Sequence, residues 1–542
     1  MIGYLGDKQF SSRDELVRYM REQLLGKRKV AVDAETHNLQ YTQPVGIGIA
    51  ASGEEAFYFT IEPELEDEIP WKVLIDPGVL KVFHNALFDL NTLIDFHIDD
   101  TNIVDTSTIC RLLCQPAKLT EAVGRFLPGM EVHDMSEYIS GSQTTMELPL
   151  EVLSRKCCQD VMATYALHEV LGELVDQQYL AVEMDIIPIL IGMSRRGIGI
   201  DHEERVRLEG KYETDKVYYG GLCKEYGFNP GSSQQVGYIL AKRNNLLPMR
   251  RVINKRTGKR EVKISTRAEN MVVLEDPLAQ AVLGYRKASK ILSTYLRPME
   301  IHDRAYCRWH TEARTGRITS TRRNLQNIPP EVRSMYIPDN EHFTDWDATQ
   351  IELRCLAYIS GDEEMQEVFD SGGDIHQDTA DFMGIERRIA KNVGFAMIYG
   401  ATAKTIMETA GIQSRGMAEQ LRDMWFDRYK MAGLWIVTTQ EEGLRNGMVR
   451  TLYGRTLKLP SLEEEREDGI RRKAVNYIIQ GSAAEIIKRV MVKCSQLPVV
   501  LQVHDELIAD GDAAEGVRKL DLDHIAPFHI PFKIRLMERW EV

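Results

Sequence analysis

Several short apolar stretches of the chain end in carboxylates. They include VAVDAE (30–35), FTDWDA (343–348) and QVHDEL (502–507). Side chains two residues apart on a β-strand project from one face, so Asp33 and Glu35 would point the same way. A buried, unpaired carboxylate costs free energy, and two together need a cation or solvent. The pattern therefore predicts strands whose acidic ends bind cations.

Length and hydropathy favour a large globular chain. With 542 residues, of which 43% are hydrophobic, we expect about three or four domain-sized units. The chain has no apolar run of about 20 residues, and residues 1–25 do not resemble a signal peptide. We therefore expect a soluble, intracellular (cytoplasmic) protein without a membrane partner.

The charge is acidic overall but basic in one segment. Net charge is −14, which by itself argues weakly against a nucleic-acid partner. Phosphate contacts are local, however, and residues 242–263 carry nine Lys and Arg against the single acid Glu261. A solvated hairpin and a nucleic-acid contact both remain open at this point.

The eight cysteines show no metal-binding or redox spacing. None forms a C-x-x-C pair, and Cys157 and Cys158 are adjacent. Adjacent side chains diverge on a helix, so we expect these two to pack as small apolar residues.

The hydrophobic pattern predicts a compact α/β domain of about 175 residues followed by a longer mixed region. A long apolar helix begins near residue 180 and ends at Arg196–Gly197. The predicted elements are two strands in 29–52, a strand and helix in 82–96, helices in 148–178, 278–298 and 362–446, and a β-hairpin in 251–264 that turns at Thr257–Gly258.

Acids on separate elements of the first domain suit divalent cations. Asp33 and Glu35 share a strand, Asp89 lies on the next predicted helix with Asn85, and Asp160 lies on a third helix. Magnesium prefers oxygen ligands, and two such ions can activate water and stabilise the leaving oxygen in phosphodiester hydrolysis.

These motifs resemble the proofreading 3′–5′ exonuclease domain of DNA polymerases. VAVDAETHNL, HNALFDLNTL and KCCQDVMATYALH match its three motifs, and IVDTSTICRLL fits the segment around Asp105. The resemblance implies Asp33, Glu35, Asp89 and Asp160 as catalytic metal ligands. The family has a tyrosine four residues before the last acid, where this chain has Lys156, so the group that orients the attacking water is missing and exonuclease strength stays open.

A second constellation lies in the C-terminal two-thirds. Asp347 and Asp505, at the ends of separate strands, could jointly hold two metals for phosphoryl transfer. RRIAKNVGFAMIYG (387–400) places cations and then aromatics at steps of four on one helix face, suited to a triphosphate and a nucleoside. An ordinary amphipathic helix is the alternative for this segment taken alone.

Together these motifs resemble family A DNA polymerases, the bacterial DNA polymerase I group. Further matching segments are FNPGSSQQVGYIL (228–240), TGRITSTRRNLQNIP (315–329), DIH (374–376), YGRTLKLP (453–460) and VNYIIQGSAAEIIKRVM (475–491). The implied fold is α/β and α+β multidomain: a ribonuclease H-like exonuclease domain (1–178), then a right-hand polymerase domain (179–542). Its thumb spans about 180–300, its palm about 301–361 and 447–542, and its fingers about 362–446.

The resemblance also assigns roles to residues. Asp347 and Asp505, with the Ala348 carbonyl, would bind two Mg²⁺ ions, with Mn²⁺ as an alternative. Lys391 would act in catalysis and assist pyrophosphate departure. The nucleotide would contact Arg387, Lys391, Phe395, Tyr399, Gln350, Glu352 and His376. DNA would contact Arg317, Asn324, Gln326, Asn327, Arg455, Asn476, Gln480 and His504, and the thumb cations Lys255, Arg256, Lys259 and Arg260.

The implied activity is template-directed addition of dNTPs to a primer in DNA replication, with a proofreading exonuclease. Partners would be primed DNA and dNTPs, with a replication helicase or single-strand binding protein as further candidates and a monomer as the assembly. The 5′-nuclease domain of many bacterial members is expected to be absent, as in a phage-type enzyme. The alternatives are a single-subunit RNA polymerase, a polymerase with an inactive exonuclease, and a DNA-binding protein with degenerate sites.

Overall fold

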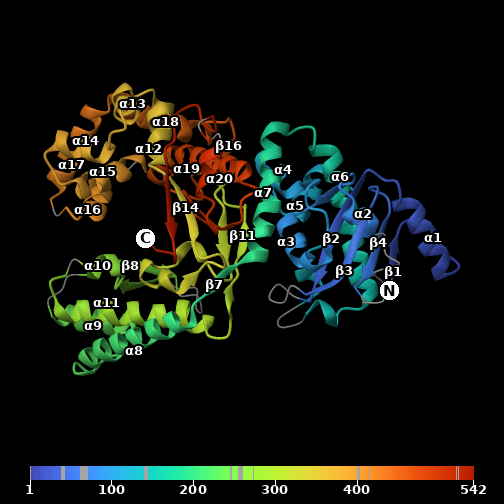
Figure 1. Ribbon diagram of the computed structural model, residues 1–542, viewed down its shortest axis with the longest axis horizontal. Coiled ribbons are helices and arrows are strands. Elements are labelled where there is room, and N and C mark those ends of the chain that lie inside the picture. Colours follow the sequence, from blue (N-terminus) through green and yellow to red (C-terminus); the bar gives the residue numbers. More distant parts are fainter. Residues whose placement is uncertain are drawn as a thin grey trace.

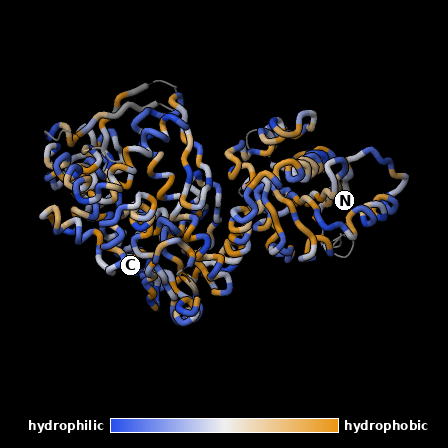
Figure 2. Tube along the Cα trace, turned by 90° about the horizontal axis from the view of Figure 1, so that it is seen from above, coloured by the Kyte–Doolittle hydropathy of each residue, from blue (hydrophilic) through white to orange (hydrophobic). Residues whose placement is uncertain are grey.

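The computed structural model shows two bodies joined through helix α7 (Figure 1). It describes residues 2–37, 43–61, 71–139, 144–243, 247–253, 260–272, 274–399, 403–412, 414–520, 522 and 524–541. Figure 2 shows hydrophobic and hydrophilic segments interleaved in both bodies. Among the described helices, none has the length and apolar character needed to cross a membrane.

A mixed six-stranded sheet forms the centre of the N-terminal body. Its order is β1-β4-β3-β2-β5-β6, with β2 antiparallel to β3 and parallel to β5. The two strands expected in 29–52 are confirmed as β2 and β3. The strands are β1 Ile2–Leu5, β2 Lys29–Thr36, β3 Pro44–Ala50, β4 Ala56–Thr60, β5 Leu80–Phe83 and β6 Ile103–Asp105; the helices are α1 Arg13–Leu24, α2 Trp71–Ile75, α3 Ala86–Thr92, α4 Thr106–Leu112, α5 Leu119–Phe126 and α6 Leu150–Leu171.

Helix α6 packs closely on the sheet because β3 carries glycine beneath it. A Cβ added to Gly48 would lie 2.7 Å from the Cys157 Sγ. Cys157 and Cys158 are both buried, and all eight cysteines are free thiols, so the expected packing role is confirmed. The close approach carries Lys156 and Asp160 of α6 over the acids of β2.

Helix α7 (Gln177–Arg196) links the two bodies. It ends at Gly197, as expected, where φ is 57° and an added Cβ would lie 2.8 Å from the Ala305 carbonyl. Glu183 of α7 is buried and accepts two hydrogen bonds from Lys488 of α19, at 2.7 and 2.8 Å. One cluster of buried hydrophobic residues continues from the N-terminal sheet through α7 into the C-terminal body.

The predicted thumb, about residues 180–300 and called the thumb segment, contains a hydrophobic cluster of its own, which includes Cys223, Val236 and Val282. The hairpin strands are confirmed and pair in antiparallel register, while the turn at Thr257–Gly258 lies outside the described residues. The elements are α8 His202–Lys224, α9 Ser233–Lys242, β8 Met249–Ile253, β9 Arg260–Ile264, α10 Ala268–Met271 and α11 Pro277–Lys290, followed by a π-helical turn, Ile291–Leu296.

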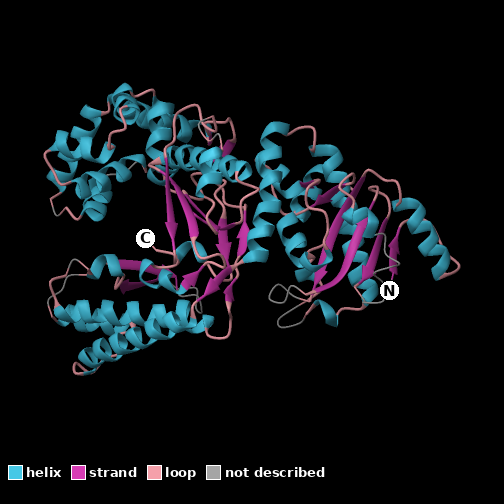
Figure 3. Ribbon diagram, viewed as in Figure 1, coloured by secondary structure: helices cyan, strands magenta, loops and turns pink. Residues whose placement is uncertain are grey.

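The predicted palm, called the palm segment, contains an antiparallel sheet of order β17-β18-β14-β19. Figure 3 draws the strands of the protein in magenta. Its strands are β14 Phe343–Ala348, β17 Val499–Val503, β18 Glu506–Asp510 and β19 Phe532–Met537, and helices α12 Ile351–Ser360, α19 Glu467–Lys493 and α20 Ala514–Lys519 accompany them. Smaller strands are β7 Ile198–Ile200, β10 Arg304–Ala305, β11 Arg308–His310, β12 Thr319–Thr321, β13 Tyr336–Ile337, β15 Met448–Arg450 and β16 Thr456–Lys458.

The helices expected in residues 362–446 are confirmed, and this predicted fingers region is called the fingers segment. Helix α15 ends at Ile398, and Gly400, the expected stop, lies outside the described residues. The helices are α13 Glu363–Asp370, α14 Ile375–Met383, α15 Arg387–Ile398, α16 Ala403–Ala410, α17 Arg415–Arg428 and α18 Lys430–Asn446.

Candidate active sites

The palm sheet brings Asp347 and Asp505 to the same end. Asp347 lies near the end of β14, opposite Glu506 of β18, and Asp505 occupies the turn between β17 and β18. The Ala348 N–H donates to the Asp505 carbonyl at 3.1 Å and ties the strand end to this turn. Two acids that are distant in sequence thus become neighbours.

Both carboxylates are short of compensating positive charge. Burial raises the pKa of Asp347, and Asp345 adds to the rise. Burial also raises the pKa of Asp505 to about 7, helped by Glu352 and Asp347. Carboxylates in such surroundings favour a bound cation, and oxygen donors suit magnesium. The donor set therefore fits divalent ions on Asp347 and Asp505, with the Ala348 carbonyl as the further predicted ligand.

A buried ion pair that was not predicted from the sequence lies in the same sheet as these acids. Asp345 is fully buried and accepts a 2.6 Å hydrogen bond from the Arg535 Nε. Burial raises the pKa of neighbouring Glu506 to about 8, and Asp345 adds to that rise. Arg535 lies opposite Asp345 only because β19 pairs with β14, so no local pattern could have identified it.

Helix α15 presents its predicted stripe as two exposed cations followed by two half-buried aromatics. The Arg387 Nε donates to Asp374 Oδ2 at 2.8 Å, and Asp374 also caps α14 by accepting from the His376 N–H. The His376 ring lies 5.6 Å from the Phe395 ring, centre to centre. Burial lowers the pKa of His376 to about 4, so this imidazole is neutral at pH 7. Lys391 is exposed and lies 5.9 Å from the Phe395 ring centre.

Glu352 is a buried acid held from two sides. Its Oε2 accepts a 2.8 Å hydrogen bond from the Tyr399 hydroxyl, and its Oε1 pairs with Arg317. Burial raises the pKa of Tyr399 to about 12, with Glu352 as the next cause. Gln350, expected nearby, donates to Asp374 at 3.4 Å. The structure thus gathers the expected nucleotide-binding residues around the start of α12 and the face of α15.

A pocket of about 210 Å³ collects several of the expected DNA-binding residues beside Asp505. Gln326 donates to the Ile318 carbonyl at 3.0 Å and to Gln502 at 2.8 Å, which orients its amide. His504 adopts a left-handed backbone with φ of 55°, which places it at the turn. The expected residues that line the pocket are Arg317, Asn324, Gln326, Asn327 and His504.

Other expected DNA contacts lie elsewhere. Gln480 hydrogen-bonds Tyr399, and the Asn476 Oδ1 is buried without a partner among the described residues. Arg455 is 8% exposed and lies 3.8 Å from Glu183, which accounts for its charge without DNA; its DNA contact stays a prediction. Lys255, Arg256 and Lys259 lie outside the described residues, as does the side chain of Arg260.

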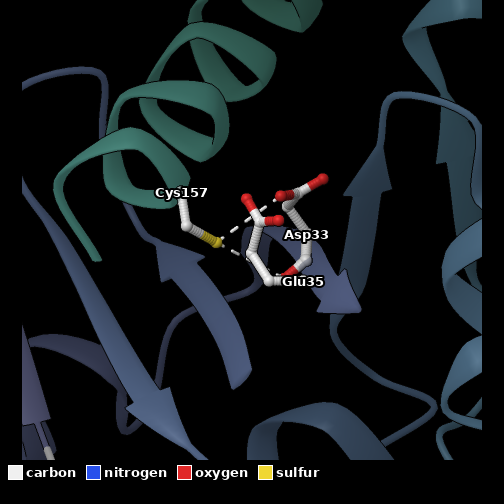
Figure 4. Close-up of side chains that lie close together, drawn as sticks. All are labelled: Asp33, Glu35 and Cys157. Carbon is white, nitrogen blue, oxygen red and sulfur yellow. Dashed lines mark hydrogen bonds between the residues drawn. The ribbon is translucent and has the colours of Figure 1, made fainter. Parts of the chain in front are cut away.

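The four exonuclease-type acids meet between β2, α3 and α6. Asp89 Oδ1 accepts from the Ala34 N–H at 2.8 Å, which fixes α3 against β2. Cys157 of α6 points toward Asp33 and Glu35, and its Sγ lies 3.5 Å from Asp33 Oδ2 (Figure 4). Burial raises the pKa of Asp33 and of Asp160 to about 6 each. Burial also raises the pKa of Glu35 and, strongly, that of Asp89.

Two residues around these acids have structural roles. Asp105, at the end of β6, accepts from the Asn85 and Ala86 N–H groups and so positions the start of α3. The prediction that Asn85 lies on this helix with Asp89 is wrong, because Asn85 is the left-handed residue before α3, with φ of 93°.

Lys156 reaches into the same cluster of acids. Its Nζ lies 2.5 Å from Asp160 Oδ2 and 3.2 Å from Glu35 Oε1. The four-residue spacing between Lys156 and Asp160 is typical of an ion pair along one helix face. This pair was not predicted from the sequence. Asp160 Oδ1 is buried and accepts no hydrogen bond from the described residues, so it suits a bound cation. Asp160 Oδ2 and Glu35 Oε1, which face Lys156, already have a cation, the Lys156 ammonium.

Comparisons with known proteins agree with this geometry. A family model described as DNA polymerase family A matches residues 208–522, and one described as 3'-5' exonuclease matches residues 9–176. DNA polymerase I of Chloroflexus aurantiacus is 29% identical over 576 aligned residues, covering 94% of this chain and 60% of that protein. The thermostable DNA polymerase I of Thermus filiformis is 31% identical over 66% of this chain and 47% of its own length. The chain thus spans about half to 60% of these relatives.

A solved structure of similar fold is the POL domain of Pol1 from M. smegmatis in complex with DNA primer-template and dNTP. Its TM-score is 0.79 at 23% identity, with 97% of this chain and 98% of that chain covered. The predicted fold class, an exonuclease domain followed by a right-hand polymerase domain, is confirmed. The polymerase model covers more than half of the sequence, and the chain belongs to DNA polymerase family A.

Proposed function

We propose that this protein is a template-directed DNA polymerase that adds dNTPs to a primer 3′ end by two-metal nucleotidyl transfer, and that its N-terminal domain is a 3′–5′ exonuclease. The observation that carries the polymerase proposal is the meeting of Asp347 and Asp505 at one end of the palm sheet, beside the Arg317–Glu352–Tyr399 cluster.

Metal binding, triphosphate binding and sugar contact would each be carried out by different residues of the chain. Two Mg²⁺ ions would be held by Asp347, Asp505 and the Ala348 carbonyl, and would supply charge stabilisation at the reacting phosphate. Arg387 and Lys391 would bind the triphosphate, since both are exposed cations on one face of α15. Lys391 would also balance charge on the departing pyrophosphate. Glu352 would line the sugar pocket.

The DNA would lie along the pocket lined by Arg317, Asn324 and Gln326, with its primer end next to Asp505. The fixed amide of Gln326 supports a polar contact with the primer–template duplex. Thumb cations would add sequence-independent phosphate contacts. A monomer in the cytoplasm, which works with a replication helicase or single-strand binding protein, fits this function.

The test is primer extension on a primed template, with dNTPs and with rNTPs. We expect efficient dNTP use, and at least about a 10²-fold loss of rate in Asp505→Asn, because a metal-binding carboxylate is removed. The matched control is Asp427→Asn, at an exposed position on α17. Primer-independent use of rNTPs would instead indicate an RNA polymerase, and full synthesis by Asp505→Asn would contradict the site.

A further inference from the structure

The strongest unexplained feature is the buried ammonium of Lys156 inside the exonuclease site. The residue is 8% exposed and its Nζ contacts Asp160 Oδ2 at 2.5 Å and Glu35 Oε1 at 3.2 Å. Both acids are themselves less than 10% exposed, so water screens these contacts little. Lys156 is therefore a buried counter-ion paired with two carboxylates at once.

The oxygens of the four acids fall into two groups. One group already has donors: Asp160 Oδ2 and Glu35 Oε1 face Lys156, and Asp89 Oδ1 accepts from the Ala34 N–H. In the other group, Asp160 Oδ1 is buried and has no partner among the described residues. Asp33 and Glu35 also offer ligand atoms within 4.8 Å of each other and of the Cys157 Sγ, and the one donor to Asp33 Oδ2 among the described residues is the weak 3.5 Å contact from that thiol. The ligand atoms of Asp33 and Glu35 lie close enough together to hold a cation, while the Glu35–Asp160 pair is already bridged by Lys156.

We propose that Lys156 is a resident cation that replaces one divalent ion at Glu35 and Asp160, so that the exonuclease site of this chain binds a single divalent ion. An ammonium and a divalent ion on the same two carboxylates repel each other strongly at low dielectric. The ammonium is tethered by its own side chain, whereas a metal ion must be recruited from solution. The Lys156 ammonium therefore occupies these carboxylates in place of a second metal ion and limits the site to one divalent ion.

This inference rests on the proposed exonuclease function for its biological meaning, but its test measures metal binding. Mn²⁺ is titrated into the full chain in an Asp347→Asn/Asp505→Asn background, which removes the palm ligands. We expect one Mn²⁺ bound tightly when Lys156 is present and two in Lys156→Met. Lys72→Met, an exposed lysine of the same domain, is the matched control and should also bind one ion.

Thermal unfolding gives a second readout if the variant is destabilised by its unpaired acids. Lys156→Met should lose stability in EDTA and regain it with Mn²⁺, with a larger metal-dependent shift in Tm than the parent. Lys156→Tyr, which restores the residue typical of the family, should behave in the same way. Two ions bound with Lys156 in place, or equal stoichiometry and equal shifts in all variants, would overturn the proposal.

Degradation of a 3′-mismatched primer separates this inference from the exonuclease assignment. Loss of degradation in Asp33→Ala/Glu35→Ala supports the exonuclease function whatever the metal count. If no variant degrades DNA while Lys156→Met still gains a second ion, the exonuclease function fails and the inference about Lys156 stands.

Discussion

Glu352 illustrates how single residues are positioned in the proposed polymerase site. Its carboxylate is almost fully buried, and each oxygen is held by a different element, through Tyr399 of the fingers and Arg317 of the palm. A side chain anchored at both oxygens cannot swing away, so it forms a fixed wall. We propose that this wall meets the 2′ side of the incoming sugar.

Shortening this side chain should therefore weaken sugar discrimination. In Glu352→Ala the space beside the sugar opens, and we expect the ratio of kcat/KM for dNTP over rNTP to fall about 10- to 200-fold, the range for small steric differences in a pocket. Single-nucleotide extension measures both values. Glu367→Ala, exposed on α13, is the control. An unchanged ratio would show that Glu352 does not contact the sugar.

At the scale of elements, the exonuclease site depends on how closely α6 approaches the sheet. Gly48 is paired with Asp33 across β2 and β3, so the glycine lies beside the acid it helps to position. Cys157 fills the space above Gly48. Cys157 thus helps to set the distance between α6 and the sheet, and with it the positions of Lys156 and Asp160.

Gly48→Ala should push α6 outward and disturb this site selectively. The added Cβ would lie 2.7 Å from the Cys157 Sγ, and we expect a loss of about 1–3 kcal/mol in unfolding free energy from overpacking. Exonuclease rate should fall while primer extension is retained, because the contact lies within the N-terminal body. Gly53→Ala, whose Cβ would meet Ala166 at an ordinary 3.4 Å, is the control. Equal exonuclease rates in the two variants would refute this dependence.

At the scale of the whole molecule, a buried ion pair joins the two bodies. Glu183 of α7 and Lys488 of α19 are 4% and 1% exposed, and Arg455 lies nearby. Burial alone would raise the pKa of Glu183, but Lys488 and Arg455 outweigh burial and hold it below its usual value. Burial lowers the pKa of Lys488, and the Glu183 carboxylate opposes that fall.

Breaking this pair from one side should destabilise the molecule. In Glu183→Gln the Lys488 ammonium stays buried without its partner, and we expect a loss of about 3–5 kcal/mol, measured by urea unfolding. Glu183→Met/Lys488→Met should recover most of it. Glu419→Gln, at an exposed pair with Arg415, should cost less than about 1 kcal/mol.

The same pair sets a dependence on pH. Because the folded pKa of Glu183 lies below its ordinary value of 4.5, its contribution to stability is present above that value and is lost as pH falls through the folded pKa. Wild-type stability should therefore decline more steeply below pH 4.5 than that of Glu183→Met/Lys488→Met. Parallel declines would show that the pair does not govern acid unfolding.

Most of the helices and strands, and the acids that gather at the two candidate sites, were predictable from local sequence patterns, whereas the roles of these acids stay predictions. Strand alternation, the helix stop at Gly197 and the acids at strand ends are local signals, because each depends on residues a few positions apart. Tertiary structure decided what these residues contact. Arg535 meets Asp345 only through the pairing of distant strands, and Arg455 turns toward Glu183 in the interior. In the sequence, Lys156 stands only where related proteins have a tyrosine. In the folded chain it is a buried counter-ion, because the packing of α6 brings its ammonium within reach of Glu35 on β2.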